Sequence, residues 1–317
     1  MAFRHVPVMV NEVIESLNCR PGQIYMDGTL GGAGHGRAIL KQILPGGKLI
    51  GIDLDRAAID NAEIELKSDM DHVHLVCGNF RDFPVFLKKL AIPSLNGILL
   101  DLGVSLHQIR ASGRGFSFKR DEPLDMRMSS DAVTRASDLI NGRSEDELNR
   151  IFRTYGEERW SRRIARRIVS ERKRRRIEST RHLADLVIEA IPGRARRTQR
   201  IHPATRVFMA LRISVNRELE SLESFLSVVS DYLKPFGRLC VISFHSLEDR
   251  IVKTRMKEMA CDCICPPDFP VCVCNHRSVG RVLTRKVVRP GKEEVERNPM
   301  ARSSRLRVVE RLPDRIN

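Results

Sequence analysis

The sequence contains no long apolar run. Nothing in its 317 residues approaches the roughly 18 consecutive apolar side chains that a membrane-spanning helix requires. Near the N-terminus, Arg4, Asn11, Glu12 and Glu15 interrupt the apolar pattern, so a signal peptide is not expected either. The sequence therefore predicts a cytoplasmic protein that has no membrane partner.

Acidic side chains are in deficit. The chain has 40 Asp and Glu residues against 55 Lys and Arg residues, which gives a formal net charge of +15 at pH 7. An excess of this size favours a polyanionic partner. The excess is greatest between Arg159 and Arg176, where the only acidic residue is Glu171.

This basic segment is predicted to be a helix with two different faces. Arginines recur at steps of three and four on one face, and apolar side chains recur on another. The two sets are Arg159, Arg162, Arg163, Arg166 and Arg167, and Trp160, Ile164 and Ile168. Residues 193–200 (GRARRTQR) extend the charge into a segment expected to be flexible, and His202 and Arg206 are further candidate contacts to the polyanion. A face that binds phosphates is the favoured interpretation, with a merely solvated helix face as the alternative.

The C-x-x-C pairs that structural zinc usually prefers are also missing. A dense group of possible ligands is arranged as C-x-C pairs instead: Cys261, Cys263, Cys265, Cys272, Cys274 and His276. A zinc ion that braces the loop and a set of unligated surface thiols both remain open. The other cysteines, Cys19, Cys77 and Cys240, are expected to be small buried side chains in a reducing compartment.

A G-x-G-x-x-G dinucleotide signature is absent as well. Residues 24–37 instead read IYMDGTLGGAGHGR, and GKLIGIDLD follows, which indicates a strand, a glycine turn, a helix, a second strand and a carboxylate. Glycines let the turn approach a ligand closely, and either Asp53 or Asp55 is placed to accept hydrogen bonds from ribose hydroxyls. The pattern favours S-adenosylmethionine, with Asp27 orienting its ammonium group, over a dinucleotide or a purely structural turn.

Strands and helices are expected to alternate up to residue 101, which predicts a mostly parallel sheet. Strands are expected at 24–26, 49–52, 73–77, 97–100, 237–244, 281–288 and 304–312, and helices at 36–44, 56–67 and 82–90. The last two strands are expected to form an antiparallel edge of this seven-stranded sheet. Residues 105–204 are expected to form an inserted helical, basic domain, the part that would bind the polyanion, between core segments 1–104 and 205–317. Residues 205–233 are expected to be one long core helix, because apolar side chains recur there in steps of three and four.

Four of the predicted strands end near polar or aromatic side chains. These are Asp27, Asp53, Asn79 with Phe80, and Asp101. In open α/β sheets ligands bind outside the carboxyl ends of the strands, so these residues are expected to share one pocket.

Eight blocks of the sequence, in order, closely resemble the bacterial RsmH or MraW methyltransferase family. They are HVPVMVNEVIESL, DGTLGGAGHGR, DLGVS, RGFSFKRDEPLDMRM, YGEERWSRRIARRIV, HPATRVFMALRI, FHSLEDRIVK and NPMARSSRLRV. The resemblance implies a class I S-adenosylmethionine-dependent methyltransferase, with a Rossmann-like, seven-stranded sheet and an inserted helical domain. It implies methylation of N4 of a cytidine in the decoding centre of 16S rRNA, within the small ribosomal subunit. DNA is not an expected partner, and the formation of a homodimer stays open.

The resemblance also implies which residues contact the cofactor. They are Ala33, Gly34, His35, Asp53, Phe80, Asp101 and Gln108. Three of them have simpler alternatives, because His35 can cap a helix, Phe80 can belong to the core and Gln108 can lie in a surface loop.

The Asp-Pro-Pro-Tyr type of motif that holds the target base in many amino-methyltransferases is missing after the fourth predicted strand. Residues 101–105 read DLGVS there, so we expect Asp101 to be the catalytic residue, accepting the amino protons together with a backbone carbonyl. The segment FHSLEDR is expected to line the base side with His245, Ser246, Glu248 and Asp249, or else to be a polar helix start. Two rival functions stay open: a nicotinamide oxidoreductase and a non-catalytic RNA-binding ribosome-assembly factor.

Overall fold

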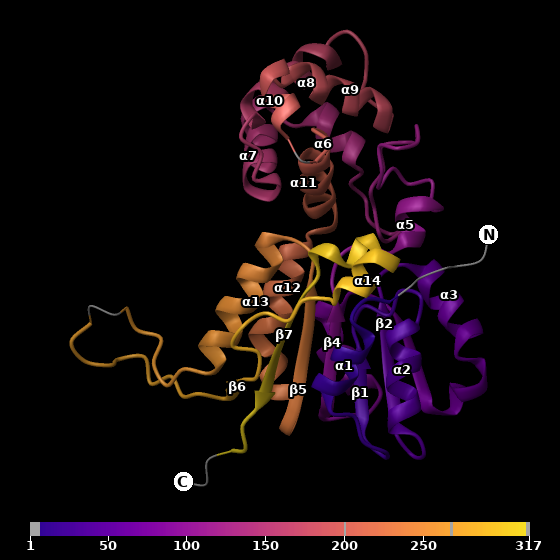
Figure 1. Cartoon of the computed structure of the whole chain (residues 1–317), viewed down its shortest axis with the longest axis vertical. Coiled ribbons are helices and arrows are strands. Elements are labelled where there is room, and N and C mark those ends of the chain that lie inside the picture. The colour runs from indigo at the N-terminus through magenta and orange to yellow at the C-terminus, as the bar shows by residue number, and fades with distance from the viewer. Residues whose placement is uncertain (1–6, 200, 267–268, 315–317) are drawn as a thin grey trace. The chain divides into compact units, whose positions relative to one another are not determined.

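The structure, a computed structural model, describes residues 7–199, 201–266 and 269–314 (Figure 1). The chain divides into two compact units. The sheet unit comprises Phe3–Gly103 and Leu219–Asn317, and the helical unit comprises Val104–Glu218. The helical unit is thus an insertion in the sequence of the sheet unit.

The sheet unit contains a seven-stranded sheet of order β3-β2-β1-β4-β5-β7-β6. The strands are β1 (Ile24–Asp27), β2 (Lys48–Asp53), β3 (Val73–Cys77), β4 (Leu95–Asp101), β5 (Leu233–Ser243), β6 (Gly280–Val282) and β7 (Arg305–Arg311). Strands β1 to β5 pair in parallel, and β7 runs antiparallel to both β5 and β6. The mostly parallel sheet with an antiparallel edge is confirmed, and it is the class I arrangement that the resemblance implies. Strand β6 is much shorter than the predicted 281–288, because only Gly280–Val282 pair continuously with β7.

Helices cover both faces of this sheet (Figure 1). One face carries α1 (Val10–Leu17), α2 (Gly34–Ile43) and α3 (Arg56–Glu65), and the other carries α4 (Phe83–Lys89), α12 (Glu218–Val228) and α13 (Ser246–Met259). The unit also contains α14 (Lys292–Arg297) and the short 3-10 helices η1 (Lys67–His72), η2 (Phe80–Asp82), η3 (Val229–Tyr232) and η4 (Pro299–Ser303).

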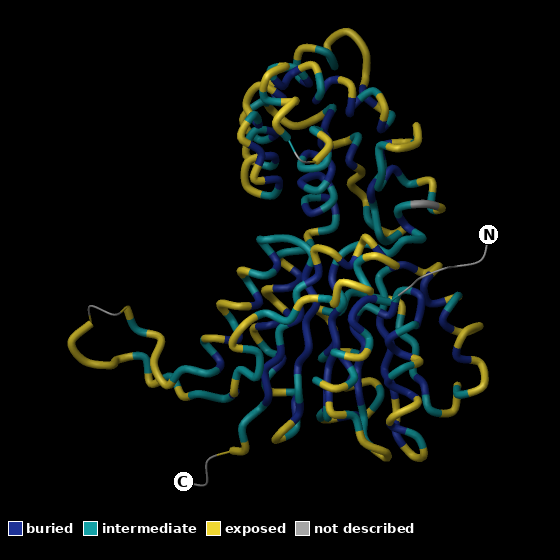
Figure 2. Tube along the Cα trace, viewed as in Figure 1, coloured by how far each residue is buried: buried dark blue, intermediate teal, exposed yellow. Residues whose placement is uncertain are grey.

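Alternating side chains of each strand fill the two cores. In β1, Tyr25 packs with the α1–α3 face and Met26 packs with the α4, α12 and α13 face. The strands therefore run through the most buried part of the unit (Figure 2). Because both faces are covered, the strands have the nearly continuous apolar character that identified them in the sequence.

The helical unit is built around its own core. Its helices are α5 (Leu106–Arg110), α6 (Ala136–Gly142), α7 (Glu145–Gly156), α8 (Ser161–Arg172), α9 (Thr180–Ala190), α10 (Gly193–Thr198) and α11 (Thr205–Asn216). Phe152 of α7, Ile164 and Ile168 of α8 and Leu211 of α11 are among its buried side chains.

The expected long helix over 205–233 is wrong, and so is the domain boundary at residue 204. The chain breaks at Arg217, which has a left-handed backbone (φ 51°) between α11 and α12. Helix α11 packs in the core of the helical unit, while Leu222 and Phe225 of α12 pack on the sheet. The apolar repeat runs across the break because the helices on both sides are amphipathic, so periodicity did not reveal it.

None of the helices in the described part of the chain has the length and apolar character that crossing a membrane requires.

Candidate active site

The glycine turn after β1 is anchored to neighbouring strands by backbone hydrogen bonds. The Gly28 amide donates to the Leu99 carbonyl (2.9 Å), and the Leu30 amide donates to the Ile52 carbonyl (2.9 Å). The turn then enters α2 through Ala33, whose left-handed conformation (φ 59°) starts the helix. The loop is therefore held where the carboxyl ends of the strands meet, and the first amides of α2 lie beside it.

Two glycines of the loop leave no room for a side chain. A Cβ at Gly28 would lie 2.5 Å from Leu100 Cδ2, and a Cβ at Gly34 would lie 2.7 Å from Pro7 Cγ. Close packing of the backbone thus explains the glycine requirement at both positions.

Asp53, at the end of β2, accepts two backbone hydrogen bonds. Its Oδ2 accepts one from the Gly31 amide (2.7 Å), and its Oδ1 accepts one from the Asp55 amide (2.8 Å). Burial nevertheless raises the pKa of Asp53 to about 6. Asp55 caps α3 by accepting from the Ala57 amide (3.2 Å), whereas Asp53 is the last residue of β2, at the carboxyl edge of the sheet, and is therefore the better candidate for a ribose acceptor.

Asp101, at the end of β4, faces His35. His35 Nε2 lies 2.8 Å from the Val8 carbonyl oxygen, and Nδ1 lies 3.6 Å from Asp101 Oδ2. A carbonyl can only accept, so Nε2 carries a proton. An attractive contact at Nδ1 then needs one more proton, on His35 or on Asp101. His35 is buried within the first turn of α2 and is therefore placed to orient Asp101.

Two carboxylate oxygens at this edge are buried and have no hydrogen-bond partner among the described residues: Asp27 Oδ2 and Asp101 Oδ1. Burial, with the Asp53 carboxylate nearby, raises the pKa of Asp27 to about 7. Burial also raises the pKa of Asp101 well above its ordinary value, and Asp27 and Glu248 add to that shift. Unpartnered buried oxygens are costly, so these two indicate a site for a ligand that carries donors or positive charge.

The FHSLEDR segment forms a polar helix start, which is one of its two predicted roles. His245 caps α13 by accepting from the Glu248 amide (3.4 Å), and Glu248 Oε2 accepts from the Phe244 amide (2.8 Å). His245 Nε2 lies 3.0 Å from Glu248 Oε1. This is a polar helix start, yet the charge of Glu248 is close enough to act on Asp101. The Asp249 carboxylate forms an ion pair with Arg307 (2.7 Å).

Phe80 lies beside the loop and also belongs to the core. Its ring meets the ring of Phe225 edge to face, with centroids 5.6 Å apart. A Cβ added at Gly28 would lie 3.3 Å from the Cβ of Phe80. Phe80 is therefore a core residue, as the simpler alternative predicts. It also lies next to Gly28 in the glycine loop.

Gln108 belongs to the helical unit, whereas the other six predicted cofactor residues belong to the sheet unit. Its Oε1 accepts from the Ser105 amide (3.0 Å), and its own amide donates to Ser105 Oγ (3.2 Å). This reciprocal capping box fixes Gln108 at the start of α5.

Many arginines of the basic segment form structural contacts. Arg167 pairs with Glu171 and Glu189 (2.8 Å each), and Arg172 donates to the Ile140 carbonyl (2.7 Å). In contrast, Arg162 and Arg174 are exposed and form no ion pair with any residue that the structure describes. The prediction that the whole arginine face meets phosphates is therefore too broad, and only part of it remains available.

The segment after α9 is also more ordered than expected. Residues Gly193–Thr198 form α10, in place of the predicted flexible segment, and Arg200 lies outside the described residues. His202 stacks on Phe118 (centroids 4.3 Å apart), and Arg206 lies 4.0 Å from Glu158. The last two are candidate RNA contacts that already have partners within the helical unit.

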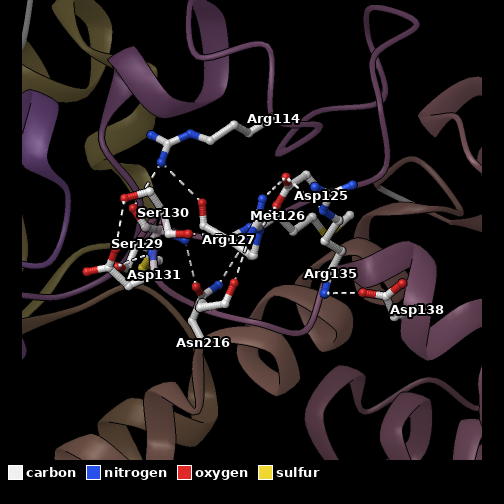
Figure 3. Close-up of polar contacts among 12 residues, drawn as sticks. Arg114, Asp125, Met126, Arg127, Ser129, Ser130, Asp131, Arg135, Asp138 and Asn216 are labelled. Carbon is white, nitrogen blue, oxygen red and sulfur yellow. Dashed lines mark hydrogen bonds and ion pairs between the residues drawn. The ribbon is translucent and has the colours of Figure 1, made fainter.

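The block RGFSFKRDEPLDMRM is largely structural (Figure 3). Arg127 forms two hydrogen bonds to the Asp125 carboxylate (2.7 and 2.8 Å). Asn216 accepts from the Met128 amide and donates to the Met126 carbonyl (2.8 Å each), across a left-handed residue, Met126 (φ 62°). These contacts tie the segment before α6 to the end of α11.

Two contacts of the site were not predicted. Thr29 Oγ1 accepts from the Asp101 amide (2.6 Å), joining the glycine loop to β4. The second is the pairing of His35 with the Val8 carbonyl described above. The only available signal was that Thr29 and Val8 lie within the blocks DGTLGGAGHGR and HVPVMVNEVIESL. The expected burial of Cys77 is wrong, because this cysteine is exposed at the end of β3.

Comparisons with known proteins give one consistent answer. The model of the MraW methylase family matches residues 2–312. A Ribosomal RNA small subunit methyltransferase H from Desulfosudis oleivorans is 54% identical over 98% of this chain and 100% of its own length. The protein of the same name from Desulforapulum autotrophicum is 52% identical over 98% and 100%.

A solved structure, of an rRNA methylase from Streptococcus thermophilus, has a TM-score of 0.43 at 9% identity, over 99% of both chains. The family model and the two relatives each extend over nearly the whole sequence, through both units. The chain therefore belongs to the MraW methylase family.

Proposed function

We propose that this protein transfers a methyl group from S-adenosylmethionine to N4 of a cytidine in the decoding centre of 16S rRNA. Membership of the MraW methylase family and the names of the relatives support small-subunit rRNA as substrate. The choice of cytidine N4 rests on the resemblance carried by the eight sequence blocks. Because the proposed substrate is small-subunit rRNA, we expect the protein to act in the cytoplasm.

The residues present fit this cofactor. Asp27 Oδ2 and Asp101 Oδ1 are buried and have no hydrogen-bond partner among the residues that the structure describes, and an ammonium group and a sulfonium would each be stabilised beside such oxygens. We assign Asp53 to the ribose hydroxyls and Ala33, Gly34 and His35 to the turn that encloses the ligand, with Phe80 beside it. Gln108, which belongs to the helical unit, is included only because the resemblance implies it. The cofactor supplies a methyl group activated by a positively charged sulfur.

The proposed chemistry rests on one observation, the buried Asp101 carboxylate. The amino nitrogen of cytosine is a poor nucleophile because its lone pair is delocalised into the ring. It gains a methyl group and must lose one proton, and Asp101 Oδ1 is a buried acceptor with no other partner in the described chain. A carboxylate whose pKa lies well above its ordinary value is a stronger base. His35 Nδ1 lies 3.6 Å from the other oxygen, where it can orient Asp101.

The test is methyl transfer from labelled S-adenosylmethionine to small ribosomal subunits that lack the modification, with nucleoside digestion of the product. We expect N4-methylcytidine at a single site. Transfer to another base or to several sites would contradict the assignment of the target. A protein that binds the cofactor yet methylates neither subunits nor free rRNA would instead favour the assembly-factor function.

A further inference from the structure

The loop between α13 and β6 brings four cysteines into one cluster. The Sγ atoms of Cys263, Cys265, Cys272 and Cys274 all lie within 4.8 Å of one another. The Cys272 and Cys274 sulfurs are 3.6 Å apart, and the Cys274 and Cys263 sulfurs are 3.8 Å apart. All four are free thiols.

These separations suit a metal site. A disulfide needs sulfurs about 2.05 Å apart. A tetrahedron with Zn–S bonds of about 2.3 Å has sulfur–sulfur edges of roughly 3.8 Å. The two short contacts in the cluster are close to this edge length, so an ion can be accommodated with little movement of the chain.

Backbone amides point at the sulfurs in a repeating pattern. The Cys265 amide donates to Cys263 Sγ (3.4 Å), and the His276 amide donates to Cys274 Sγ (3.5 Å), so each amide serves the sulfur two residues earlier. Two further amides cross between the pairs, Ile264 to Cys274 Sγ (3.4 Å) and Val273 to Cys265 Sγ (3.5 Å). Neutral thiols are weak acceptors, whereas metal-bound thiolates are stabilised by such donors.

The described apolar side chains of the loop are largely exposed. Val271 and Val273 are 70% and 65% exposed, so its apolar side chains do not form a core. Near its base, Ser278 Oγ donates to Asp262 (2.8 Å). A metal ion would supply the cross-link that a segment without a core needs.

We propose that Cys263, Cys265, Cys272 and Cys274 bind one Zn²⁺ ion as a structural tetrathiolate site. Four thiolates suit zinc, which accepts tetrahedral sulfur coordination and has no redox chemistry. Cys261 lies outside the cluster. His276 Nε2 donates a hydrogen bond to the Glu258 carbonyl oxygen (2.8 Å). Neither is a ligand. The C-x-C spacing is no obstacle, because two such pairs approach each other and each contributes two sulfurs.

The site is tested by measuring metal content and zinc affinity of the full chain. We expect one zinc per chain in protein purified without chelator. After chelation, the protein should recover one equivalent of zinc from added zinc chloride. Cobalt should replace it with the absorption of a tetrahedral thiolate site, and zinc should protect four cysteines from alkylation.

Substitutions separate the ligands from their neighbours. Cys263→Ser and Cys272→Ser should each weaken zinc binding by more than the roughly 10–100-fold that loss of an outer-shell contact costs, because each removes a ligand. Cys261→Ser, in the same loop, and Cys77→Ser, on β3, should leave it unchanged. If a ligand variant does not fold, cobalt absorption and alkylation of the unaltered protein decide the question.

Four results would overturn the proposal. They are failure of the chelated protein to take up zinc, loss of zinc in Cys261→Ser, one iron per chain in place of zinc, and disulfides within the cluster in freshly purified protein.

Discussion

The carboxyl groups of Asp27 and Asp101 are buried, where ionisation costs free energy. Both have raised pKa values, chiefly because they are buried, and neighbouring carboxylates add to the effect. Such an arrangement destabilises the ligand-free protein and favours a positively charged ligand. The free energy of folding that is lost by burying these carboxyl groups is therefore linked to the proposed binding of the cofactor.

Replacing Asp101 with Asn tests the proposed proton acceptor. The amide is similar in shape but cannot take the amino proton, so we expect methyl transfer to fall by two or more orders of magnitude. Single-turnover transfer to unmodified small subunits is the measurement, and binding of S-adenosylhomocysteine should weaken far less. Asn216→Ala, in the helical unit, serves as a control for general loss of structure. Near-normal turnover of the Asp101 variant would contradict the role.

The raised pKa of Asp27 predicts how stability depends on pH. Because its folded-state pKa is about 7, above the ordinary value of 3.8, the folded protein binds the extra proton, and this residue's contribution to stability is lost as pH rises between those values. Asp27→Asn replaces the carboxyl group with an amide that does not ionise, so this loss of stability with rising pH should disappear. We expect its free energy of unfolding to exceed that of the unaltered protein by roughly 1–3 kcal/mol at pH 8, and by less at pH 5.

Urea unfolding of both proteins at the two pH values measures this difference. The same variant should bind S-adenosylmethionine more weakly, since the ammonium group loses its carboxylate. Identical pH dependence in both proteins would show that Asp27 is not the titrating group.

At the scale of elements, the glycine loop is defined by what it packs against. A Cβ at Gly28 would lie 2.5 Å from Leu100 Cδ2 in β4, and a strand side chain cannot move away freely. We expect Gly28→Ala to cost about 1–3 kcal/mol of stability. It should also lower the affinity for S-adenosylmethionine, because the loop shifts.

Gly142→Ala is the matched control. Gly142 ends α6, and a Cβ there would meet nothing within 4 Å. This variant should be neutral or slightly more stable, since alanine favours a helix. Thermal unfolding and calorimetric titration with the cofactor compare the two. Equal effects would show that packing at Gly28 is not the cause.

At the scale of the whole molecule, the net charge and its distribution determine how a polyanionic substrate is bound. The chain carries a net charge of +15, but many arginines of the basic segment are held in ion pairs or bonded to carbonyls. We propose that RNA is bound by the exposed arginines that have no acidic partner among the described residues, including Arg162, Arg174 and Arg175.

The triple replacement of these three arginines with Ala should weaken rRNA binding roughly tenfold or more. Each phosphate contact that is lost should reduce the slope of log affinity against log salt by about 0.7–0.9. Filter binding at several salt concentrations measures both. The matched control is Lys41, Lys67 and Lys88 replaced with Ala, which removes the same charge from exposed positions of the sheet unit. Equal losses would show that net charge, and not this surface, governs binding.

Individual residues show where prediction from the sequence was limited. The strands up to Asp101 and the carboxylates that end them were predictable, because buried parallel strands are short apolar runs followed by polar residues. The break at Arg217 was not, because its signal is a single left-handed residue within a continuous apolar repeat. The functions of the arginines were also hidden, since their partners, such as Glu189 and Ile140, lie far away in the sequence.

The sequence by itself determined the family, the sheet and the group of acidic strand ends, because these depend on local periodicity and on motifs written along the chain. Only the tertiary structure decided which charged groups are partnered. Within the described part of the chain, it left Asp101 Oδ1 without a hydrogen bond and placed His35 beside Oδ2. It also brought two C-x-C pairs into one cluster. These are contacts between distant residues, and their energies depend on burial and distance, which no local pattern encodes.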